Sequence, residues 1–270
     1  MELLSKGNEI QDTIVINGKE VFNKKMCRVM AGPCAVESRD QILYTAEKLA
    51  DLGVGIFRAG AFKPRTNPYA FQGAREEGLK WLEEVRDTYG MLIITETSDS
   101  TNFDAVESVA DIVQVGAKAM YDHALLRKAG NTKKPILIKR HFGATVEEMF
   151  KMADYALLEG NRKVMFCERG IRTFETSSRF TLDLCGAAVI KKETKAPLIL
   201  DPSHSMGYAF GVPDIAKACV AFGCEGILIE VHHNPKEAQC DREQALNIEQ
   251  FKKLYNEMTA IGQAIGKEVK

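Results

Sequence analysis

Apolar runs of roughly five residues alternate with segments of helical period along most of the chain. From Met26 onward each run is rich in β-branched residues, ends in a polar or glycine-rich stretch and precedes an amphipathic segment. The predicted strands cover residues 28–32, 55–61, 91–97, 112–116, 135–140, 163–168, 197–201 and 226–231. The predicted helices cover residues 39–52, 74–89, 102–109, 124–129, 146–159, 182–193, 213–222 and 243–265.

Eight strand–helix units in succession predict an α/β fold, the (β/α)8 TIM barrel. The near-continuous apolar strands also fit a parallel sheet that is covered on both faces. A doubly wound open sheet is the alternative architecture, but no G-x-G-x-x-G sequence follows the first predicted strand. In a barrel, the functional residues are expected at the C-terminal ends of the strands.

The N-terminal residues follow a different pattern. Two short β-like runs within residues 13–22 flank Asn17-Gly18, which is a strong signal for a β-hairpin. We therefore divide the chain into an N-terminal extension with a short β-hairpin cap, residues 1–25, and a catalytic (β/α)8 barrel, residues 26–270.

Composition and charge narrow the function. The 270-residue chain is 45% hydrophobic and 27% charged, and its formal net charge of -1 argues against general binding to nucleic acid or to an anionic membrane. Seven irregularly spaced cysteines, behind an N-terminus with no charged segment followed by an apolar run, indicate reduced thiols in a cytoplasmic protein. No run approaches the roughly 18 apolar residues of a membrane span.

Cations are concentrated in the loop after the second predicted strand, FRAGAFKPRTNPYAFQG at residues 57–73. Pro64 and Pro68 stiffen the backbone around Arg65, so its guanidinium is presented with little entropy left to lose. Arginine offers a planar fork and lysine a point charge, and both suit phosphoryl oxygens. The loop therefore indicates a phosphate site. The alternative interpretation is a surface turn with incidental cations.

Other charged residues follow further predicted strands, where a barrel has its mouth. The cations that would gather there are Arg58, Lys63, Arg65, Lys118, Lys139 and Arg169. Only a multiply anionic ligand would offset their mutual repulsion.

A thiol, an imidazole and two carboxylates share the predicted mouth: Cys34, His204, Glu230 and Asp241. This donor set suits one divalent transition metal, with Mn, Fe, Co or Zn all compatible, and a thiolate disfavours Mg or Ca. Taken singly, each residue also has a structural interpretation, since a lone cysteine at a strand end is commonly a small buried apolar residue.

Six segments resemble those of the 3-deoxy-D-arabino-heptulosonate 7-phosphate (DAHP) synthases, in the short form without a regulatory domain. They are GPCAVES, FRAGAFKPRTNPYAFQG, IKRHFGATVEE, CERGIRTFETSSRFTLDL, DPSHSMG and IEVHHNPKEAQCD, and the resemblance covers nearly all of residues 26–255. It implies a metal-dependent, aldol-type condensation of phosphoenolpyruvate with erythrose 4-phosphate to DAHP and phosphate, the first step of the shikimate pathway to aromatic amino acids. It also implies a cytoplasmic homo-oligomer, a dimer or a tetramer.

The resemblance assigns roles to individual residues. The metal ligands would be Cys34, His204, Glu230 and Asp241. Phosphoenolpyruvate would be bound by Arg58, Lys118, Lys139 and Arg169, and the aldose phosphate by Lys63, Pro64, Arg65 and Thr66. The catalytic group would comprise Lys139, Cys34 and His204. Lys139 is a candidate proton carrier because crowding by Arg140 and Arg169 should favour its neutral form, and a plain carboxylate anchor is its alternative role.

Four positions depart from the pattern of the family. Lys118 stands where the family typically has arginine, His141 where it has glycine, Asn67 where it has serine, and Tyr208 where it has arginine. These departures bear on the acceptor more than on the reaction. The alternative functions are a paralogue that joins phosphoenolpyruvate to a different aldose phosphate in a specialised pathway, and a non-catalytic binding or regulatory paralogue. The intact set of metal ligands argues against the second.

Overall fold

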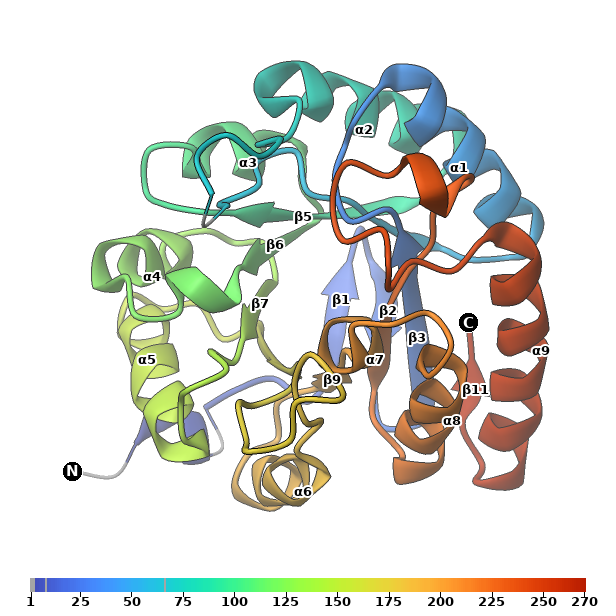
Figure 1. Cartoon of the computed structure of the whole chain (residues 1–270). Coiled ribbons are helices and arrows are strands. Elements are labelled where there is room, and N and C mark those ends of the chain that lie inside the picture. Colours follow the sequence, from blue (N-terminus) through green and yellow to red (C-terminus); the bar gives the residue numbers. More distant parts are fainter. Residues whose placement is uncertain (1–2, 8, 66) are drawn as a thin grey trace.

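Eight parallel strands close into a barrel in the computed structural model, which describes residues 3–7, 9–65 and 67–270 (Figure 1). The barrel strands are β3 Met26–Gly32, β4 Ile56–Arg58, β5 Leu92–Thr97, β6 Ile112–Val115, β7 Ile136–Lys139, β8 Val164–Glu168, β9 Leu198–Leu200 and β10 Gly226–Glu230. Each pairs in parallel with its successor, and β10 pairs with β3, where Glu230 lies beside Gly32. The predicted fold class is confirmed.

Helices form the outer layer around this ring of strands (Figure 1). They are α1 Arg39–Asp51, α2 Arg75–Tyr89, α3 Phe103–Val109, α4 His123–Gly130, α5 Val146–Leu158, α6 Leu184–Glu193, α8 Val212–Phe222 and α9 Ile248–Ala264. The short helix α7 Pro202–Met206 instead directly follows the end of β9, inside this layer (Figure 1). Thr145 and Glu148 form the capping box that the sequence predicts at the start of α5. Within the described part of the chain, none of the helices is both long and apolar enough to cross a membrane.

The N-terminal hairpin closes the bottom of the barrel. Strand β1 Ile14–Ile16 pairs in antiparallel fashion with β2 Lys19–Phe22, and both Asn17 (φ 51°) and Gly18 (φ 75°) adopt the left-handed conformation of a tight hairpin turn. The buried apolar side chains of both strands pack against barrel-interior residues such as Met30. Because this end is filled, a ligand site must lie at the opposite end.

The end of β3 depends on a glycine. Gly32 has φ +151°, and a Cβ at this position would lie 2.2 Å from the carbonyl oxygen of Arg58. Only glycine allows β3 and β4 to approach this closely. The chain then leads directly into Cys34 at the mouth of the barrel.

Helix α9 begins at Ile248, whereas the sequence analysis placed its start at residue 243. The backbone N–H of Leu246 donates to the carbonyl of Glu230, and that of His232 donates to the carbonyl of Leu246. These long-range bonds hold the chain before α9 extended beside the end of β10, so tertiary contacts override the local helical pattern.

Helix α7 and strand β11 Glu268–Val269 have no counterpart in the sequence prediction. Helix α7 is short, with Asp201 as its N-cap and Pro202 in its first turn, and it directly follows β9. The C-terminal strand β11 adds to the start of β3, beside Met26 and Cys27. Helix α7 matters most for function because it carries His204.

Candidate active site

All of the candidate site residues that the structure describes lie at the C-terminal ends of barrel strands or in the segments beyond them. Arg58, Lys139 and Glu230 are the last residues of β4, β7 and β10. Beyond strand ends lie Cys34, Lys63, Pro64, Arg65, Lys118, Arg169, His204 and Asp241. Thr66 lies outside the described residues. The barrel thus carries residues from distant parts of the chain to one end.

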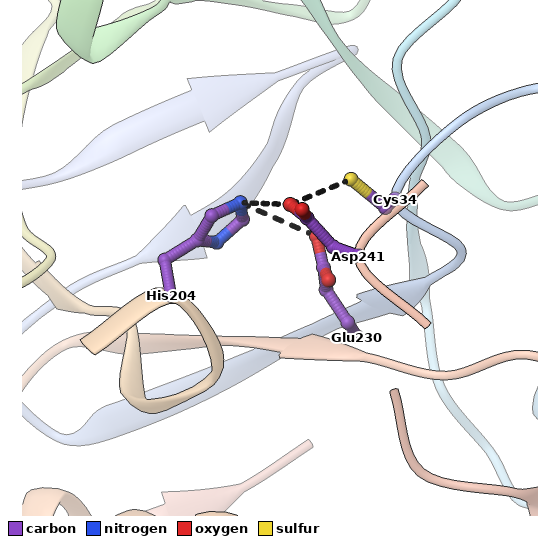
Figure 2. A group of neighbouring side chains, drawn as sticks. All are labelled: Cys34, His204, Glu230 and Asp241. Carbon is purple, nitrogen blue, oxygen red and sulfur yellow. Dashed lines mark hydrogen bonds and ion pairs between the residues drawn. The ribbon is translucent and has the colours of Figure 1, made fainter. Parts of the chain in front are cut away.

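Four potential metal ligands form a compact cluster (Figure 2): Cys34, His204, Glu230 and Asp241. Each offers one atom, and these atoms all lie within 4.8 Å of one another. His204 Nε2 lies 3.3 Å from Glu230 Oε1 and 3.8 Å from Asp241 Oδ2. Cys34 Sγ lies 3.3 Å from the same Asp241 oxygen. Sulfur, nitrogen and oxygen donors at this spacing fit a divalent transition metal.

Asp201 orients the imidazole of His204. Asp201 Oδ2 lies 2.8 Å from His204 Nδ1, and Asp201 Oδ1 accepts a hydrogen bond from the His204 backbone N–H at 2.9 Å. Burial lowers the pKa of His204, which favours the neutral ring. With the Nδ1 proton donated to Asp201, the lone pair of Nε2 faces Glu230 and Asp241, as a metal-binding histidine requires.

The same Asp201 oxygen pairs with Lys139, whose Nζ lies 2.6 Å away. Burial alone would raise the pKa of Asp201, but its interactions with His204 and Lys139 outweigh burial and hold that pKa well below its usual value. Arg140, which the sequence analysis took as a source of crowding, is itself paired with Glu168 at 2.9 Å. Two carboxylates therefore offset the cationic crowding that the sequence suggested.

Arg58 is buried behind the cluster. Its Nη1 donates to Glu230 Oε1 and to the carbonyl of Pro33, both at 2.9 Å, while Gln244 Nε2 donates to Glu230 Oε2 at 2.7 Å. Burial would raise the pKa of Glu230, but His204 and Arg58 bring it below its usual value. The structure thus places Arg58, which the sequence analysis assigned to phosphoenolpyruvate, against a candidate metal ligand.

Cys34 contacts a second thiol. Its Sγ lies 3.1 Å from Cys240 Sγ, and this hydrogen bond together with burial raises the pKa of Cys34 well above its usual value. A metal-binding cysteine must give up its proton, so metal binding at this cluster would release one. Once the Cys34 proton is released, the four donor groups fit a divalent transition metal.

A cavity of about 350 Å³ opens beside the cluster, and both His204 and Asp241 line it. Its cationic lining residues are Lys63, Arg65, Lys118, Lys139, Arg169 and Arg179. Arg169 lies 4.3 Å from the ring centre of Phe180, and its buried Nη1 has no hydrogen-bond partner among the described residues. A buried donor without an acceptor is costly, so this atom indicates where an anionic ligand group would bind.

Lys118 reaches back to the loop after β4, where its Nζ donates to the carbonyl of Pro64 at 3.1 Å. Of the departures from the family pattern, Lys118 and Asn67 line the cavity. Tyr208 lines an adjoining cavity, and His141 lines neither of the two. The departures nearest to a ligand are therefore Lys118 and Asn67.

Arg179 is a cavity residue that the sequence analysis missed. It lies between β8 and α6, where its Nη1 is 3.2 Å from Asp241 Oδ2 and donates to Gln244 Oε1 at 2.8 Å. Its place in the family segment CERGIRTFETSSRFTLDL, which follows the predicted strand 163–168, was a signal that could have identified it. Glu96 also lines the cavity, and its place near the end of β5 was a signal that could have identified it.

Peroxide is expected to inactivate the protein, and a thiol reductant should restore part of the activity. A sulfenic acid formed at Cys34 or Cys240 could condense with the other thiol to a disulfide. The hydrogen bond from Cys34 lowers the pKa of Cys240, which makes Cys240 the more easily ionised of the two. Peptide mapping by mass spectrometry would locate the modification. The exposed Cys185 is the internal control, because loss of activity that follows oxidation of Cys185 would contradict the assignment of Cys34.

Known proteins resemble this chain along nearly its whole length. The model of the DAHP synthetase I family matches residues 10–264. The chain is 42% identical over 268 residues to phospho-2-dehydro-3-deoxyheptonate aldolase of Thermotoga maritima, covering 99% of this chain and 79% of that protein. A solved structure of that name from the same organism matches with a TM-score of 0.92 and 42% identity, over 96% of this chain and 75% of the other. A 2-dehydro-3-deoxyphosphooctonate aldolase of Stenotrophomonas maltophilia is 34% identical over 255 residues, which are 88% of this chain and 91% of that protein.

Proposed function

Because the chain belongs to the DAHP synthetase I family, we propose that it condenses phosphoenolpyruvate with erythrose 4-phosphate to give DAHP and phosphate. This is the entry step of the shikimate pathway. One observation carries the proposal: the four-ligand cluster and the cation-lined cavity lie at the same mouth of the barrel. His204 and Asp241 belong to both, so a ligand in the cavity would lie against the cluster.

Lys118, Lys139 and Arg169 would hold phosphoenolpyruvate through its carboxylate and phosphate. Two anionic groups on a small molecule need separate cations to fix one orientation, with C3 facing the second substrate. The unpartnered Nη1 of Arg169 supports this placement. Lys63 and Arg65, which line the same cavity, would bind the phosphate of the aldose.

The four residues of the cluster would hold one divalent metal, Mn, Fe, Co or Zn, which when bound supplies Lewis acidity at the aldehyde oxygen. The protein sets the donor positions itself. Asp201 fixes the ring of His204, while Arg58 and Arg179 form ion pairs with the two carboxylates of the cluster. Such supporting bonds orient metal ligands and tune their basicity.

In the proposed reaction a carbon–carbon bond forms between C3 of phosphoenolpyruvate and the aldehyde carbon. Water adds at C2, and phosphate leaves with cleavage of the C–O bond. Lys139 would deliver a proton from Nζ to the former aldehyde oxygen, because its ammonium is held at the cavity wall by Asp201.

In the alternative function the acceptor is a different sugar, a five-carbon aldose phosphate. The 34% identity to a 2-dehydro-3-deoxyphosphooctonate aldolase and the departures at Lys118 and Asn67 motivate this alternative. The KPRT sequence at residues 63–66 favours the four-carbon acceptor. Purified protein should release phosphate from phosphoenolpyruvate only with erythrose 4-phosphate in a panel of aldose phosphates. Release only with a five-carbon sugar phosphate would replace the proposed acceptor, and no release with any would end the proposal.

Changing Lys118 to arginine is expected to strengthen phosphoenolpyruvate binding. An arginine fork can make two charge-assisted bonds where an ammonium makes one, and one such bond contributes about 1.5 to 3 kcal/mol. The Michaelis constant for phosphoenolpyruvate in Lys118→Arg should therefore fall by about tenfold or more, while that of the aldose phosphate stays nearly constant. Lys253→Arg, on the exposed face of α9, is the matched control. A higher constant for phosphoenolpyruvate would mean that the pocket is shaped around lysine.

A further inference from the structure

Glu37 and His232 form a carboxylate–imidazole pair at the mouth of the barrel but are not members of the four-ligand cluster. Glu37 Oε2 lies 3.5 Å from His232 Nε2, and the two side chains are only 8% and 3% exposed. Glu37 follows Cys34 by three residues, and His232 follows Glu230 by two. The pair therefore joins the segments that carry two of the candidate metal ligands.

Glu37 also holds a third segment. Its Oε1 accepts a hydrogen bond from the backbone N–H of Gln239 at 2.8 Å. Gln239 directly precedes Cys240 and Asp241 in a stretch that is neither helix nor strand. One buried carboxylate thus contacts all three loops that present Cys34, Glu230 and Asp241.

The contacts of His232 fix the direction of its ring. The Nδ1 atom accepts from the backbone N–H of Asn234 at 3.0 Å, so the neutral ring carries its proton on Nε2. This Nε2 has no hydrogen-bond partner among the described residues other than the approach to Glu37. The ring also stacks on His233, with ring centres 4.6 Å apart. The Nε2 side of the ring therefore approaches the Glu37 carboxylate without forming a hydrogen bond to it.

The loop that carries Asp241 needs such support. Asp241 has φ 49°, a left-handed conformation that is unfavourable for a residue with a side chain. Residues in such conformations persist where their surroundings over-determine them. Arg179 holds the Asp241 side chain, whereas Glu37 holds the backbone two residues earlier.

We propose that Glu37 and His232 are positioning residues that lock the three ligand-bearing loops in register, so that the affinity of the cluster for a divalent metal depends on them. This inference rests on the proposed metal site. Within the described chain, Glu37 neither lines the substrate cavity nor belongs to the cluster. The inference gives this buried carboxylate a functional role.

The test is a titration of metal-free protein with Co²⁺, followed through visible absorption of the cobalt–thiolate centre. Glu37→Ala should weaken cobalt binding by about 10- to 100-fold, the range in which loss of support outside the ligand set lowers metal affinity. Glu37→Gln keeps an acceptor for Gln239 and should recover most of the affinity. Glu47→Ala, at an exposed glutamate on the helix α1 that follows Glu37, is the control and should bind cobalt like the wild type.

A double-mutant cycle tests whether the two residues act as a pair. If they do, the Glu37→Ala/His232→Ala variant should bind cobalt no more weakly than the worse single variant.

Thermal unfolding of the metal-free proteins separates positioning from general stability. An unchanged cobalt constant in folded Glu37→Ala, or additive effects in the cycle, would overturn the positioning role alone. A wild-type protein that binds no cobalt would sink the metal proposal and this inference together. Should Glu37→Ala not fold, His232→Ala carries the same comparison, and wild-type affinity in that variant would overturn the inference.

Discussion

Removal of metal by a chelator is expected to abolish turnover, and added Mn²⁺ or Co²⁺ is expected to restore it. The four candidate ligands already lie within 4.8 Å of one another, so metal can return without rebuilding the site. Ion pairs behind the cluster, such as that of Arg58 with Glu230, keep the metal-binding atoms in place when the metal is absent. Phosphate release from phosphoenolpyruvate, measured before and after metal is restored, checks this. Full turnover in the presence of excess chelator would contradict the metal site.

The substitution His204→Ala should cost more than any other single change in the cluster. It removes the nitrogen donor and also leaves the buried Asp201 carboxylate without its imidazole partner. We expect loss of metal binding and a fall in activity of more than roughly 100-fold. Removing a residue that only supports a metal ligand typically lowers activity by up to that factor. His123→Ala on the exposed face of α4 is the matched control and should leave both properties intact. Added metal at high concentration should not rescue His204→Ala, and rescue there would show that His204 is not a ligand.

Short-range signals account for the parts of the fold that the sequence predicts well. Asn17 and Gly18 specify the hairpin turn, and Thr145 with Glu148 specify the start of α5, because each works through bonds between near neighbours. The path of residues 231–247 has no such signal. Its extended course is set by backbone bonds that pair Leu246 with the end of β10, which is visible only once the barrel has formed.

The candidate site likewise has a part that the sequence predicts and a part that it does not. The rule that barrel strands end at the functional face placed Cys34, His204, Glu230 and Asp241 at one mouth, and the resemblance to the DAHP synthases assigned them as metal ligands. Two ion pairs of the site join residues that lie far apart in the sequence, since Arg58 and Glu230 are 172 residues apart and Lys139 and Asp201 are 62 apart. No periodicity or spacing encodes these pairs, so the sequence could name the cations and the ligands without showing which of them neutralise one another.

A further large effect is expected for Lys139→Met. Lys139 lines the cavity, and its ammonium is held 2.6 Å from Asp201, whose carboxylate also faces His204. Methionine fills a similar volume but removes the charge that would hold phosphoenolpyruvate and the proton that would be delivered. It also leaves Asp201 with a single partner. We expect kcat/KM for phosphoenolpyruvate to fall by about 10²- to 10⁴-fold, the range of a lost proton carrier, as measured by initial rates of phosphate release.

Lys139→Arg separates the two roles that the site allows this residue. Arginine keeps the positive charge and the ion pair with Asp201, but it cannot give up a proton at any working pH. If Lys139 delivers the proton, kcat should fall by about 10²-fold or more while the Michaelis constant for phosphoenolpyruvate changes little. Equilibrium binding of phosphoenolpyruvate to the variant, measured separately, should stay close to that of the wild type. A variant that keeps its kcat would instead assign Lys139 to anchoring the substrate, because charge alone would then be sufficient.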